Sequence, residues 1–348
     1  MKLGILGFAH GHVNNYCRQW RANPDLGVEV VAGWDHDAER AAKAARQPGI
    51  ENFETPEALL ETGGVDGVVV AAETSLHAEL VEKAAAAGKA IVLQKPMALE
   101  LEEADRIVAA VEKAGVPFTM AWQMRADRQN LVMREMVRSG RLGKLLMVRR
   151  RHGLTTQKFP GFEDSWHADP ELNRDIWADD ASHPIDFIYW LLGKPESVTA
   201  ELSSMLNPGV PNDNGVAVFR CADGLLAEVC CSFVCLAHEA TTEIIGEKGV
   251  LIQNYGDGPS SNCERPPEGI ELKWFSAESR KWEVLDVPGY PKQGDRIANL
   301  AAPLADFLNG KRAPIATAEE GRDTLRMTLA CYQSSDKGKR VPLKFSVE

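Results

Sequence analysis

The first third of the chain alternates short apolar segments with amphipathic helical segments, and this alternation constrains the fold more than any other feature. The apolar segments have the length and β-branched character of strands, and they lie at residues 3–6, 28–32, 67–72, 90–93 and 118–121. Helical periodicity lies between them, most clearly at residues 38–46, 76–87 and 100–114. Gly88 and Gly115 follow the last two of these helices as C-terminal caps. We therefore expect an α/β fold in which βαβ units build a doubly wound parallel sheet.

The pattern changes from about residue 125 onward. A helix (130–139), a strand (145–151) and a long polar loop lead to a helix at residues 182–192. Strand-like segments follow at 198–204, 216–220, 227–233, 241–246, 250–252, 271–274 and 282–285, and the tail is helical at 297–308 and 319–337, where Thr317 and Glu320 have capping-box spacing. Successive strands joined by short turns favour a mostly antiparallel open sheet with one helix-covered face. A chain of 348 residues exceeds the usual size of one core, so we expect a first domain at residues 1–122 and a second, α+β domain at 123–348.

Charge and cysteine content exclude several classes of function. The formal net charge of −11 disfavours binding to nucleic-acid phosphates or to anionic membrane surfaces. The chain has no apolar run long enough to span a membrane, and it starts with a strand-like segment rather than a leader peptide. Its seven cysteines are odd in number and include no Cys-x-x-Cys pair, so we expect buried thiols in a reducing cytoplasm and no metal site.

A candidate dinucleotide loop follows the first strand directly. The sequence Gly7-Phe8-Ala9-His10-Gly11-His12 leads into a helix, as the G-x-G-x-x-G loop of Rossmann domains does. The first of the three glycines is kept, whereas Ala9 stands at the second position and His12 at the third. One methyl group costs little room near a pyrophosphate, but a histidine enlarges the contact between helix and strand. By itself the loop is compatible with a second interpretation, in which His10 and His12 merely lie at a helix N-terminus.

Asp35 strengthens the cofactor interpretation. It follows the second strand, about 20 residues beyond the glycine loop, where a carboxylate accepts hydrogen bonds from the ribose hydroxyls of a dinucleotide. The same carboxylate repels a 2′-phosphate, which favours NAD over NADP as the cofactor. The alternative is a solvated turn residue ahead of the next helix.

Four segments, in this order, resemble the glucose–fructose oxidoreductase, inositol dehydrogenase and MocA (Gfo/Idh/MocA) family. They are the third strand and its turn at residues 65–77, Gln94-Lys95-Pro96, Asp179–Asp186, and Thr317–Gly321 with a helix and Gly338–Val341 behind it. The corresponding family motifs are a Thr-Pro-Asn turn, Glu-Lys-Pro, Asp-x-Gly-x-His-x-x-Asp and a closing helix and strand. The resemblance runs from the first strand to the last helix. It implies an NAD(P)-dependent oxidoreductase that transfers a hydride to or from a hydroxyl or keto carbon of a sugar, inositol or related polyol.

The resemblance also implies a catalytic group of Lys95, Asp179 and His183, in which Lys95 and His183 meet across the cleft between the domains. Hydride transfer needs a base for the hydroxyl proton, and a histidine titrates near neutrality. Asp179 lies four residues before His183, close enough on a helix to orient the imidazole or to bond a substrate hydroxyl. Lys95 would hydrogen-bond the same oxygen as it gains negative charge. The alternatives are a helix N-terminal residue for His183 and a solvated strand-end charge for Lys95.

The remaining site residues follow from the same resemblance. The expected cofactor contacts are Gly7, Phe8, Ala9, His10, His12, Asp35, Ala72, Glu73, Thr74, His77, Gln94 and Lys95. The expected substrate contacts are Arg125, Trp166, His167, Asp179 and His183, and the arginine run at 149–151 is expected to be a solvated strand. Three departures from the family leave the substrate open: Gln94 replaces a glutamate, Glu73-Thr74 replaces Pro-Asn, and Asn173-Arg174-Asp175 replaces a glycine triplet.

Two other functions stay open beside the dehydrogenase. A redox-neutral enzyme would oxidise and re-reduce its substrate within one turnover, giving epimerisation, elimination or glycoside cleavage. A sensor would keep the fold and the dinucleotide without turnover. In each case the resemblance implies a small-molecule partner and a homo-oligomer, a dimer or tetramer, formed through the sheet of the second domain.

Overall fold

The computed structural model describes residues 1–47, 49–155, 160–256 and 258–345. These residues form two compact units, which we call the first and the second unit. The first unit consists of Met1–Gln123, Glu171–Asn173 and Ile297–Leu325, and the second of Met124–Pro170, Arg174–Arg296 and Arg326–Glu348. The sequence predicts one division after residue 122, whereas in the structure two later segments also belong to the first unit.

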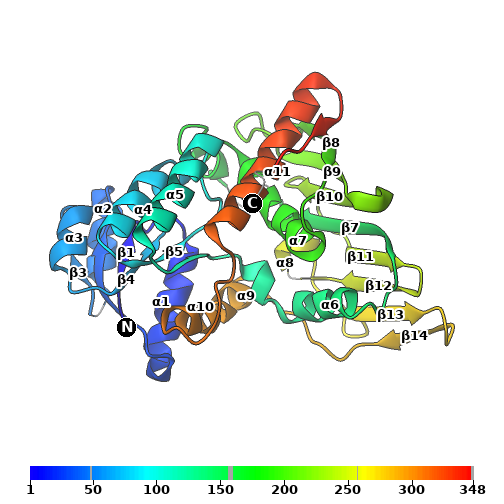
Figure 1. Cartoon of the computed structure of the whole chain (residues 1–348), viewed down its shortest axis with the longest axis horizontal. Coiled ribbons are helices and arrows are strands. Elements are labelled where there is room, and N and C mark those ends of the chain that lie inside the picture. The colour runs from blue at the N-terminus through cyan, green and yellow to red at the C-terminus, as the bar shows by residue number, and fades with distance from the viewer. Residues whose placement is uncertain (48, 156–159, 257, 346–348) are drawn as a thin grey trace. The chain divides into compact units, whose positions relative to one another are not determined.

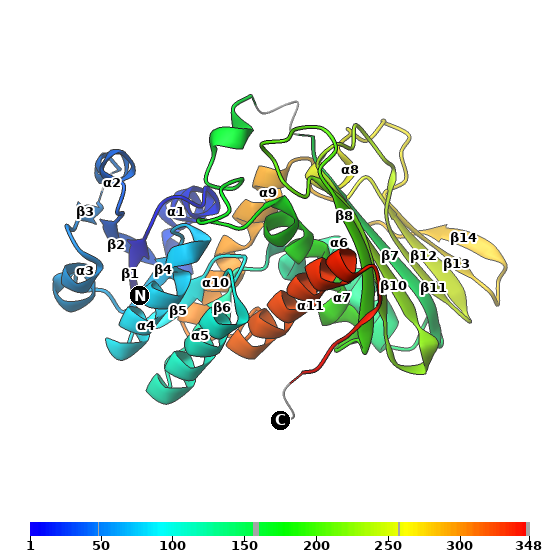
Figure 2. The same cartoon turned by 90° about the horizontal axis from the view of Figure 1, so that it is seen from above.

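The first unit is built on a parallel sheet in the strand order β3-β2-β1-β4-β5-β6 (Figure 1). Its strands are β1 (Lys2–Leu6), β2 (Glu29–Trp34), β3 (Glu51–Asn52), β4 (Gly67–Val70), β5 (Ala90–Leu93) and β6 (Phe118–Met120). Its helices are α1 (His12–Ala22), α2 (Ala38–Ala45), α3 (Pro56–Thr62), α4 (His77–Ala86), α5 (Leu101–Ala114) and α10 (Ala301–Leu308). The neighbouring strands pair in parallel, which confirms the expected sheet. Figure 2 shows α1 and α4 on opposite faces of this sheet.

Local sequence signals set the boundaries of these elements. Asp37 caps α2, because its carboxylate accepts a hydrogen bond from the amide of Arg40 (2.8 Å). Gly115 ends α5 in the left-handed conformation with φ 62°, as its position predicts. Thr55 and Pro56 begin α3, which periodicity does not reveal because the helix has only seven residues. The strand order reverses between β1 and β4, and open α/β sheets bind ligands beyond the carboxyl ends of the strands at such a point.

Residues 297–325 belong to the first unit, and specific hydrogen bonds fix this segment. The indole of Trp20, on α1, donates a hydrogen bond to the carbonyl oxygen of Ala301 (2.8 Å). At the start of α11 (Ala318–Lys337), the amide of Glu320 donates to Oγ1 of Thr317 (3.2 Å). The amide of Thr317 in turn donates to Oε2 of Glu320 (3.0 Å), which confirms the capping box expected from the sequence.

The second unit is built on a sheet in the strand order β14-β13-β12-β11-β7-β10-β9-β8-β15 (Figure 1). Its strands are β7 (Leu145–Gly153), β8 (Ser197–Ser203), β9 (Asn214–Arg220), β10 (Leu226–Ser232), β11 (Ala240–Gly246), β12 (Gly249–Asn254), β13 (Leu272–Ser276), β14 (Lys281–Val284) and β15 (Val341–Pro342). Its helices are α6 (Arg128–Arg138), α7 (Ser182–Leu192), α8 (Gly258–Ser261), the start of α9 (Gln293–Asn299) and the end of α11. The pairing is antiparallel except between β7 and β10, which confirms the expected mostly antiparallel sheet.

Alternate residues of β7 face the core of the second unit and the opposite surface of its sheet. Val148 and His152 are buried, whereas Arg149 is half-buried and forms ion pairs on that opposite surface. Arg150 also faces the core and is 1% exposed, so the expectation of a solvated arginine run is wrong at this position. The guanidinium of Arg150 donates a hydrogen bond to Oε1 of Gln253 (2.7 Å), which offsets the cost of its burial.

Candidate cofactor and substrate sites

The loop after β1 has room for no side chain at its first residue. Gly7 adopts φ +85°, and a Cβ atom there would lie 2.4 Å from the Cα atom of Ala72. The amide of Gly7 donates to the carbonyl oxygen of Trp34 (2.8 Å), and the amide of His10 donates to that of Ala71 (2.9 Å). The loop is thus held between the carboxyl ends of β2 and β4. The N-terminus of α1 follows at once, and such a terminus favours an anionic group such as a pyrophosphate.

The two substituted glycine positions are accommodated without a break in the loop. Ala9 is half-buried. His12 is the first residue of α1, and its ring lies edge-on against the ring of His10 with 4.3 Å between the ring centroids. His10 is 2% exposed. The added bulk of His12 is therefore directed onto another imidazole.

Asp35 joins the loops after β1 and β2. Its Oδ2 atom accepts a hydrogen bond from the amide of Phe8 (2.7 Å), and its Oδ1 atom accepts one from the amide of Asp37 (2.8 Å). The Phe8 ring lies over Gly33, where a Cβ atom would come within 3.0 Å of it. Asp35 is 6% exposed, so it is not the solvated turn residue of the alternative interpretation.

Arg40, on α2, is a residue of this site that the sequence motifs do not identify. Its Nε atom donates to Oδ2 of Asp35 (3.0 Å), and its Nη2 atom reaches both Oδ1 of Asp35 (3.0 Å) and Oε1 of Glu73 (2.6 Å). Nε2 of His36 lies 2.9 Å from the other oxygen of Glu73. Burial lowers the pKa of Arg40, but the hydrogen bonds and charges of Asp35 and Glu73 outweigh burial and raise it. The available signal was an arginine at the start of the helix that follows Asp35.

A small pocket lies beside this cluster in the first unit. It has a volume of about 270 Å³ and is lined on one side by Trp34, His36 and Pro56, and on the other by Ser75 and Leu76. Its walls are largely apolar, its charged lining residues are Glu79 and Lys83, and His36 is the lining residue that also contacts Glu73. Such a pocket suits a flat heterocycle attached to a ribose.

The loop after β4 carries three of the expected cofactor residues. Glu73 and Thr74 are at most 2% exposed, and Oγ1 of Thr74 donates a hydrogen bond to Oδ1 of Asn173 (2.5 Å). The ring of His77 is fully buried, with Nδ1 3.0 Å from the carbonyl oxygen of Pro96 and Nε2 3.2 Å from that of Ala72. Burial lowers the pKa of His77 to about 4, so the ring is neutral at pH 7. This geometry favours a role for His77 in holding the loops after β4 and β5.

Gln94 and Lys95 follow β5 at the carboxyl edge of the same sheet. Gln94 is fully buried, and its Nε2 atom donates a hydrogen bond to the hydroxyl of Tyr16 (3.2 Å). Lys95 is 3% exposed, and its peptide bond to Pro96 is cis. A lysine buried to this degree is not a solvated charge at a strand end, which excludes that alternative interpretation.

In the second unit, an irregular helical turn carries Asp179 and leads directly into α7, which carries His183. Trp177–Ala181 form a π-helical turn directly before α7. Such turns are rare and occur often at functional sites. Asp179 and His183 are at most 3% exposed, and Nε2 of His183 lies 3.9 Å from Oδ1 of Asp180. Oδ2 of Asp179 lies 2.8 Å from Nδ1 of His167, an imidazole that the sequence motifs do not pair with this carboxylate.

The imidazole of His167 lies in an aromatic setting. Its ring stacks on that of Trp166 with 4.0 Å between centroids, and on that of Phe162 with 6.0 Å. The side chain of His167 is 28% exposed, whereas its partner Asp179 is 4% exposed. A stacked aromatic face beside a buried carboxylate suits a ligand that has both an apolar ring face and hydroxyl groups. His152, 5.9 Å from His183 between ring centroids, is a further buried imidazole that no sequence motif assigns to the site.

Arg125 is committed to another residue of the second unit. Its Nε and Nη2 atoms donate to the two carboxylate oxygens of Asp186 at 2.9 and 2.7 Å. Both side chains are at most 2% exposed. Asp186 lies on α7, one turn after His183, so the pair fixes the segment that carries the histidine. This geometry favours a positioning role for Arg125 over direct contact with substrate.

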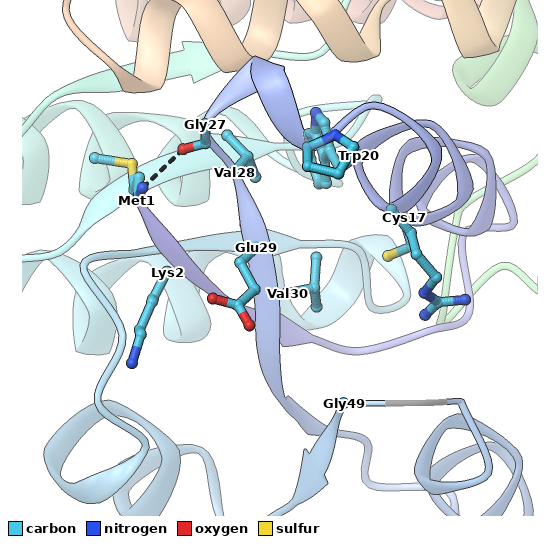
Figure 3. Close-up of a pocket in the computed structure, with 11 residues that line it drawn as sticks. Met1, Lys2, Cys17, Trp20, Gly27, Val28, Glu29, Val30 and Gly49 are labelled. Atoms are coloured by element: carbon cyan, nitrogen blue, oxygen red, sulfur yellow. Dashed lines mark hydrogen bonds between the residues drawn. The ribbon is translucent and has the colours of Figure 1, made fainter.

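A larger hollow of about 740 Å³ lies at the opposite edge of the first unit's sheet (Figure 3). Trp20 and Cys17 of α1 form one wall, and Met1, Gly27 and Val30 belong to the other. The terminal amine of Met1 donates to the carbonyl oxygen of Gly27 (2.7 Å). This hollow lies where β1 and β2 begin, whereas the residues expected to bind a cofactor lie where the strands end. We therefore place the cofactor site at the carboxyl edge despite its smaller pocket.

In the described part of the chain, no group of three or more His, Cys, Asp or Glu side chains is placed to hold a metal ion. None of the described helices combines the length and the apolar character needed to cross a membrane.

Comparisons with known proteins identify the family. Residues 1–122 match the model of the oxidoreductase family with an NAD-binding Rossmann fold, and residues 131–252 match the GFO/IDH/MocA C-terminal domain. The chain belongs to the GFO/IDH/MocA family. It is accordingly an NAD-binding oxidoreductase, as the sequence motifs predict.

Relatives with assigned names align over most of their length. The chain is 28% identical to a D-apiose dehydrogenase of Paraburkholderia graminis, over 95% of this chain and 86% of that protein. It is 27% identical to a 1,5-anhydro-D-fructose reductase of Ensifer adhaerens, over 98% of both. The crystal structure of the WlbA dehydrogenase from Bordetella pertussis, in complex with NADH and UDP-GlcNAcA, matches with a TM-score of 0.81 at 24% identity over 99% of this chain and 98% of that one. This last match supports the fold.

Proposed function

We propose that this oxidoreductase transfers a hydride between NAD and a hydroxyl or keto carbon of a small sugar, inositol or related polyol. The observation that carries the proposal is a buried lysine, Lys95, at the carboxyl edge of an NAD-binding sheet, in a chain whose second unit has a buried His183 on α7, directly after a π-helical turn. The relatives named after apiose and anhydrofructose support a polyhydroxylated substrate.

We propose the following places for the cofactor. We place the pyrophosphate at the N-terminus of α1 and at the loop Gly7–His12, which includes Phe8, Ala9 and His10. This loop needs a glycine at its first position, because a side chain at Gly7 would collide with Ala72. Asp35 binds the ribose of the adenosine half, and the 270 Å³ pocket receives its adenine. Glu73 lies on the adenosine side, joined to Asp35 through Arg40, whereas Ala72, Thr74 and Gln94 border the nicotinamide half. His77 supports the loop after β4 from behind. When bound, the nicotinamide supplies or accepts the hydride.

We assign the proton chemistry to this chain's own residues. His183 takes the proton of the reacting hydroxyl in the oxidation direction and returns it in the reduction direction. Lys95 donates a hydrogen bond to the same oxygen as it gains negative charge. Asp179, with His167 and Trp166, binds neighbouring hydroxyls and one face of the substrate, because a buried carboxylate accepts hydrogen bonds that a polyol can donate.

Substitution of the two catalytic residues tests this proposal. A panel of aldoses, anhydrosugars, inositols and sugar acids is screened with NAD by nicotinamide absorbance, and the best substrate is used for the variants. We expect Lys95→Ala and His183→Ala to lower turnover by about 10²–10⁴-fold while NADH binding persists. His238→Ala is the matched control, because no proposed step uses this histidine. Near-normal turnover in either catalytic variant contradicts the assignment, and product formation without a net absorbance change indicates a redox-neutral reaction instead.

We further propose a homo-oligomer that forms through the outward surface of the second unit's sheet. Large apolar side chains are exposed on this surface, namely Val216 (42%), Leu226 (36%), Trp282 (49%) and Val284 (61%). Contact of this surface with a second copy would remove these apolar side chains from water. Light scattering should report a dimer or tetramer, and Val216→Lys combined with Val284→Lys should give monomers. Leu236→Lys is the control, since Leu236 is exposed outside the strands (67%).

A reducing cytoplasm is the compartment we propose for the chain. The seven cysteines, all within the described part of the chain, form no disulfide. Burial raises the pKa of Cys17 and Cys221 to about 11 in each case, which keeps these thiols protonated.

A further inference from the structure

Four charged or titratable side chains form a closed cluster at the carboxyl ends of β2 and β4. Arg40 lies between two carboxylates, with Asp35 on one side and Glu73 on the other. His36 contacts the second oxygen of Glu73 and also lies 3.1 Å from Nη2 of Arg40. Glu73 stands where the family turn has no carboxylate, so this cluster belongs to the chain's own sequence and not to the family motif.

The carboxylate of Asp35 is already saturated with hydrogen-bond donors. Oδ2 accepts from the amide of Phe8 (2.7 Å) and from Nε of Arg40 (3.0 Å), and Oδ1 accepts from the amide of Asp37 (2.8 Å) and from Nη2 of Arg40 (3.0 Å). A carboxylate offers about four acceptor positions in all. Ribose hydroxyls can therefore bind Asp35 only if a present donor leaves. Two of the donors are backbone amides of the loops, so the guanidinium is the one that can move.

Glu73 determines where the displaced guanidinium stays. Its side chain is 3% exposed, and its Oε1 atom lies 2.6 Å from Nη2 of Arg40, closer than the 3.0 Å that separates the same Nη2 atom from Asp35. A buried carboxylate keeps its cation, because separation leaves an uncompensated charge in a medium of low dielectric constant. Arg40 is thus retained by Glu73 when it leaves Asp35, and it is not released toward the ribose.

We propose that Glu73 determines the cofactor preference of this chain by holding Arg40 away from the 2′ position of the adenosine ribose. With Glu73 present, Asp35, Glu73 and Arg40 sum to one negative charge, which repels a 2′-phosphate. Without the charge of Glu73 the sum is zero, and Arg40 becomes available for a bidentate contact with the phosphate. The inference rests on the proposed place of the ribose at Asp35.

Binding measurements on Glu73→Gln test the inference without reliance on turnover. Titrations with NADH and NADPH, followed by energy transfer from tryptophan or by calorimetry, give the two dissociation constants. We expect Glu73→Gln to bind NADPH about tenfold or more tightly than the wild type, with NADH affinity changed by less than about threefold. Adding Arg40→Ala to Glu73→Gln should abolish the gain, because the guanidinium is the group that receives the phosphate.

A second ion pair of the first unit provides the matched control. Arg106 and Glu82 are joined at 2.9 and 2.5 Å on α5 and α4, and Glu82→Gln with and without Arg106→Ala should leave both dissociation constants unchanged. Arg40→Ala alone, a variant with an intact Glu73, should bind NADH at least as tightly as the wild type, because no guanidinium must leave Asp35.

The outcomes separate the inference from the proposed function. Normal NADH binding with no gain in NADPH affinity in Glu73→Gln overturns the role of Glu73 and leaves the cofactor site in place. Weaker NADH binding in Arg40→Ala, by more than about threefold, overturns the displacement of the guanidinium from Asp35. Unchanged NADH affinity in Asp35→Ala overturns the place of the ribose, and the inference with it.

Discussion

The two units hold their functional residues in different ways. In the first unit the loop after β1 is fixed by its own backbone amides: those of Gly7 and His10 donate to the carbonyl oxygens of Trp34 and Ala71, and that of Phe8 donates to the carboxylate of Asp35. In the second unit the π-helical turn and α7 are fixed by side chains that lie far apart in the sequence, such as Arg125 with Asp186. The backbone hydrogen bonds of the first unit follow from the fold itself, whereas the segment in the second unit depends on individual pairs of side chains.

This difference determines what each region tolerates. Strand ends of a parallel sheet present the same amides whatever the side chains are, so the loop of the first unit can accept Ala9 and His12 in place of glycine. A segment held by buried ion pairs tolerates substitution less well, because removal of one partner leaves the other charge without compensation. Substitutions should therefore affect the two regions unequally.

The largest expected effect is that of Arg125→Ala. Asp186 has no exposed side-chain surface, so loss of its bidentate partner leaves a buried carboxylate and should cost about 3–5 kcal/mol of unfolding free energy. Denaturant unfolding followed by intrinsic fluorescence measures the loss. NADH binding should persist wherever the protein remains folded, since the proposed cofactor residues lie in the first unit.

A surface ion pair of the same unit is the control for this prediction. Arg265 pairs with Glu271, and its side chain is 47% exposed, so Arg265→Ala should cost less than about 1 kcal/mol. Equal losses in Arg125→Ala and Arg265→Ala would mean that the buried pair does not fix α7, and the contrast between the units would then fail.

The same contrast explains which features could be predicted from the sequence. Spacing after a strand is local information, so Gly7, Asp35 and Lys95 could be placed at the carboxyl edge of the sheet. The role of Arg40 depends on Glu73, 33 residues later, and the carboxylate of Asp179 contacts His167 on a preceding loop. Hydrophobic periodicity reports burial and local conformation, and it carries no information on which polar side chains meet.

The same distinction between local and long-range information applies to the secondary-structure elements. The antiparallel strands of the second unit could be predicted because strand-like segments follow one another there across short turns. The two-residue strand β3 and the return of residues 297–325 to the first unit could not, since both depend on contacts between distant parts of the chain.

The next largest expected effect is a change of the unfolding free energy with pH, caused by His77 in the first unit. Its pKa is about 4 in the folded chain and about 6.5 in an unfolded one, so the folded state favours the neutral ring. The stabilisation is complete above pH 6.5 and is lost as the pH falls toward 4. Between pH 7 and pH 5 the unfolded chain gains a proton that the folded chain lacks, which should cost about 2 kcal/mol.

Comparison with His77→Gln isolates this contribution. The amide cannot take up the proton, so the variant should lose about 2 kcal/mol less than the wild type between pH 7 and pH 5 in denaturant unfolding. The carboxylates titrate in both proteins and cancel in this difference. An identical loss in the two proteins would show that the ring is already protonated between the two loops.

The smallest expected effect concerns Arg174, where the second unit does depend on backbone conformation. Arg174 adopts φ 70°, a left-handed conformation that costs a residue with a Cβ atom about 1 kcal/mol and costs glycine little. Its side chain stacks over the ring of Tyr332 at 5.4 Å, and both Arg174→Gly and Arg174→Ala remove that contact equally. The comparison of the two variants therefore isolates the effect of backbone conformation.

We expect the glycine variant to be more stable than the alanine variant by about 1 kcal/mol, the reverse of their order in a helix interior. Thermal unfolding of the pair measures the sign. An alanine variant that is the more stable of the two would place this residue outside the left-handed region, and the glycine triplet of the family at this position would then need another physical reason.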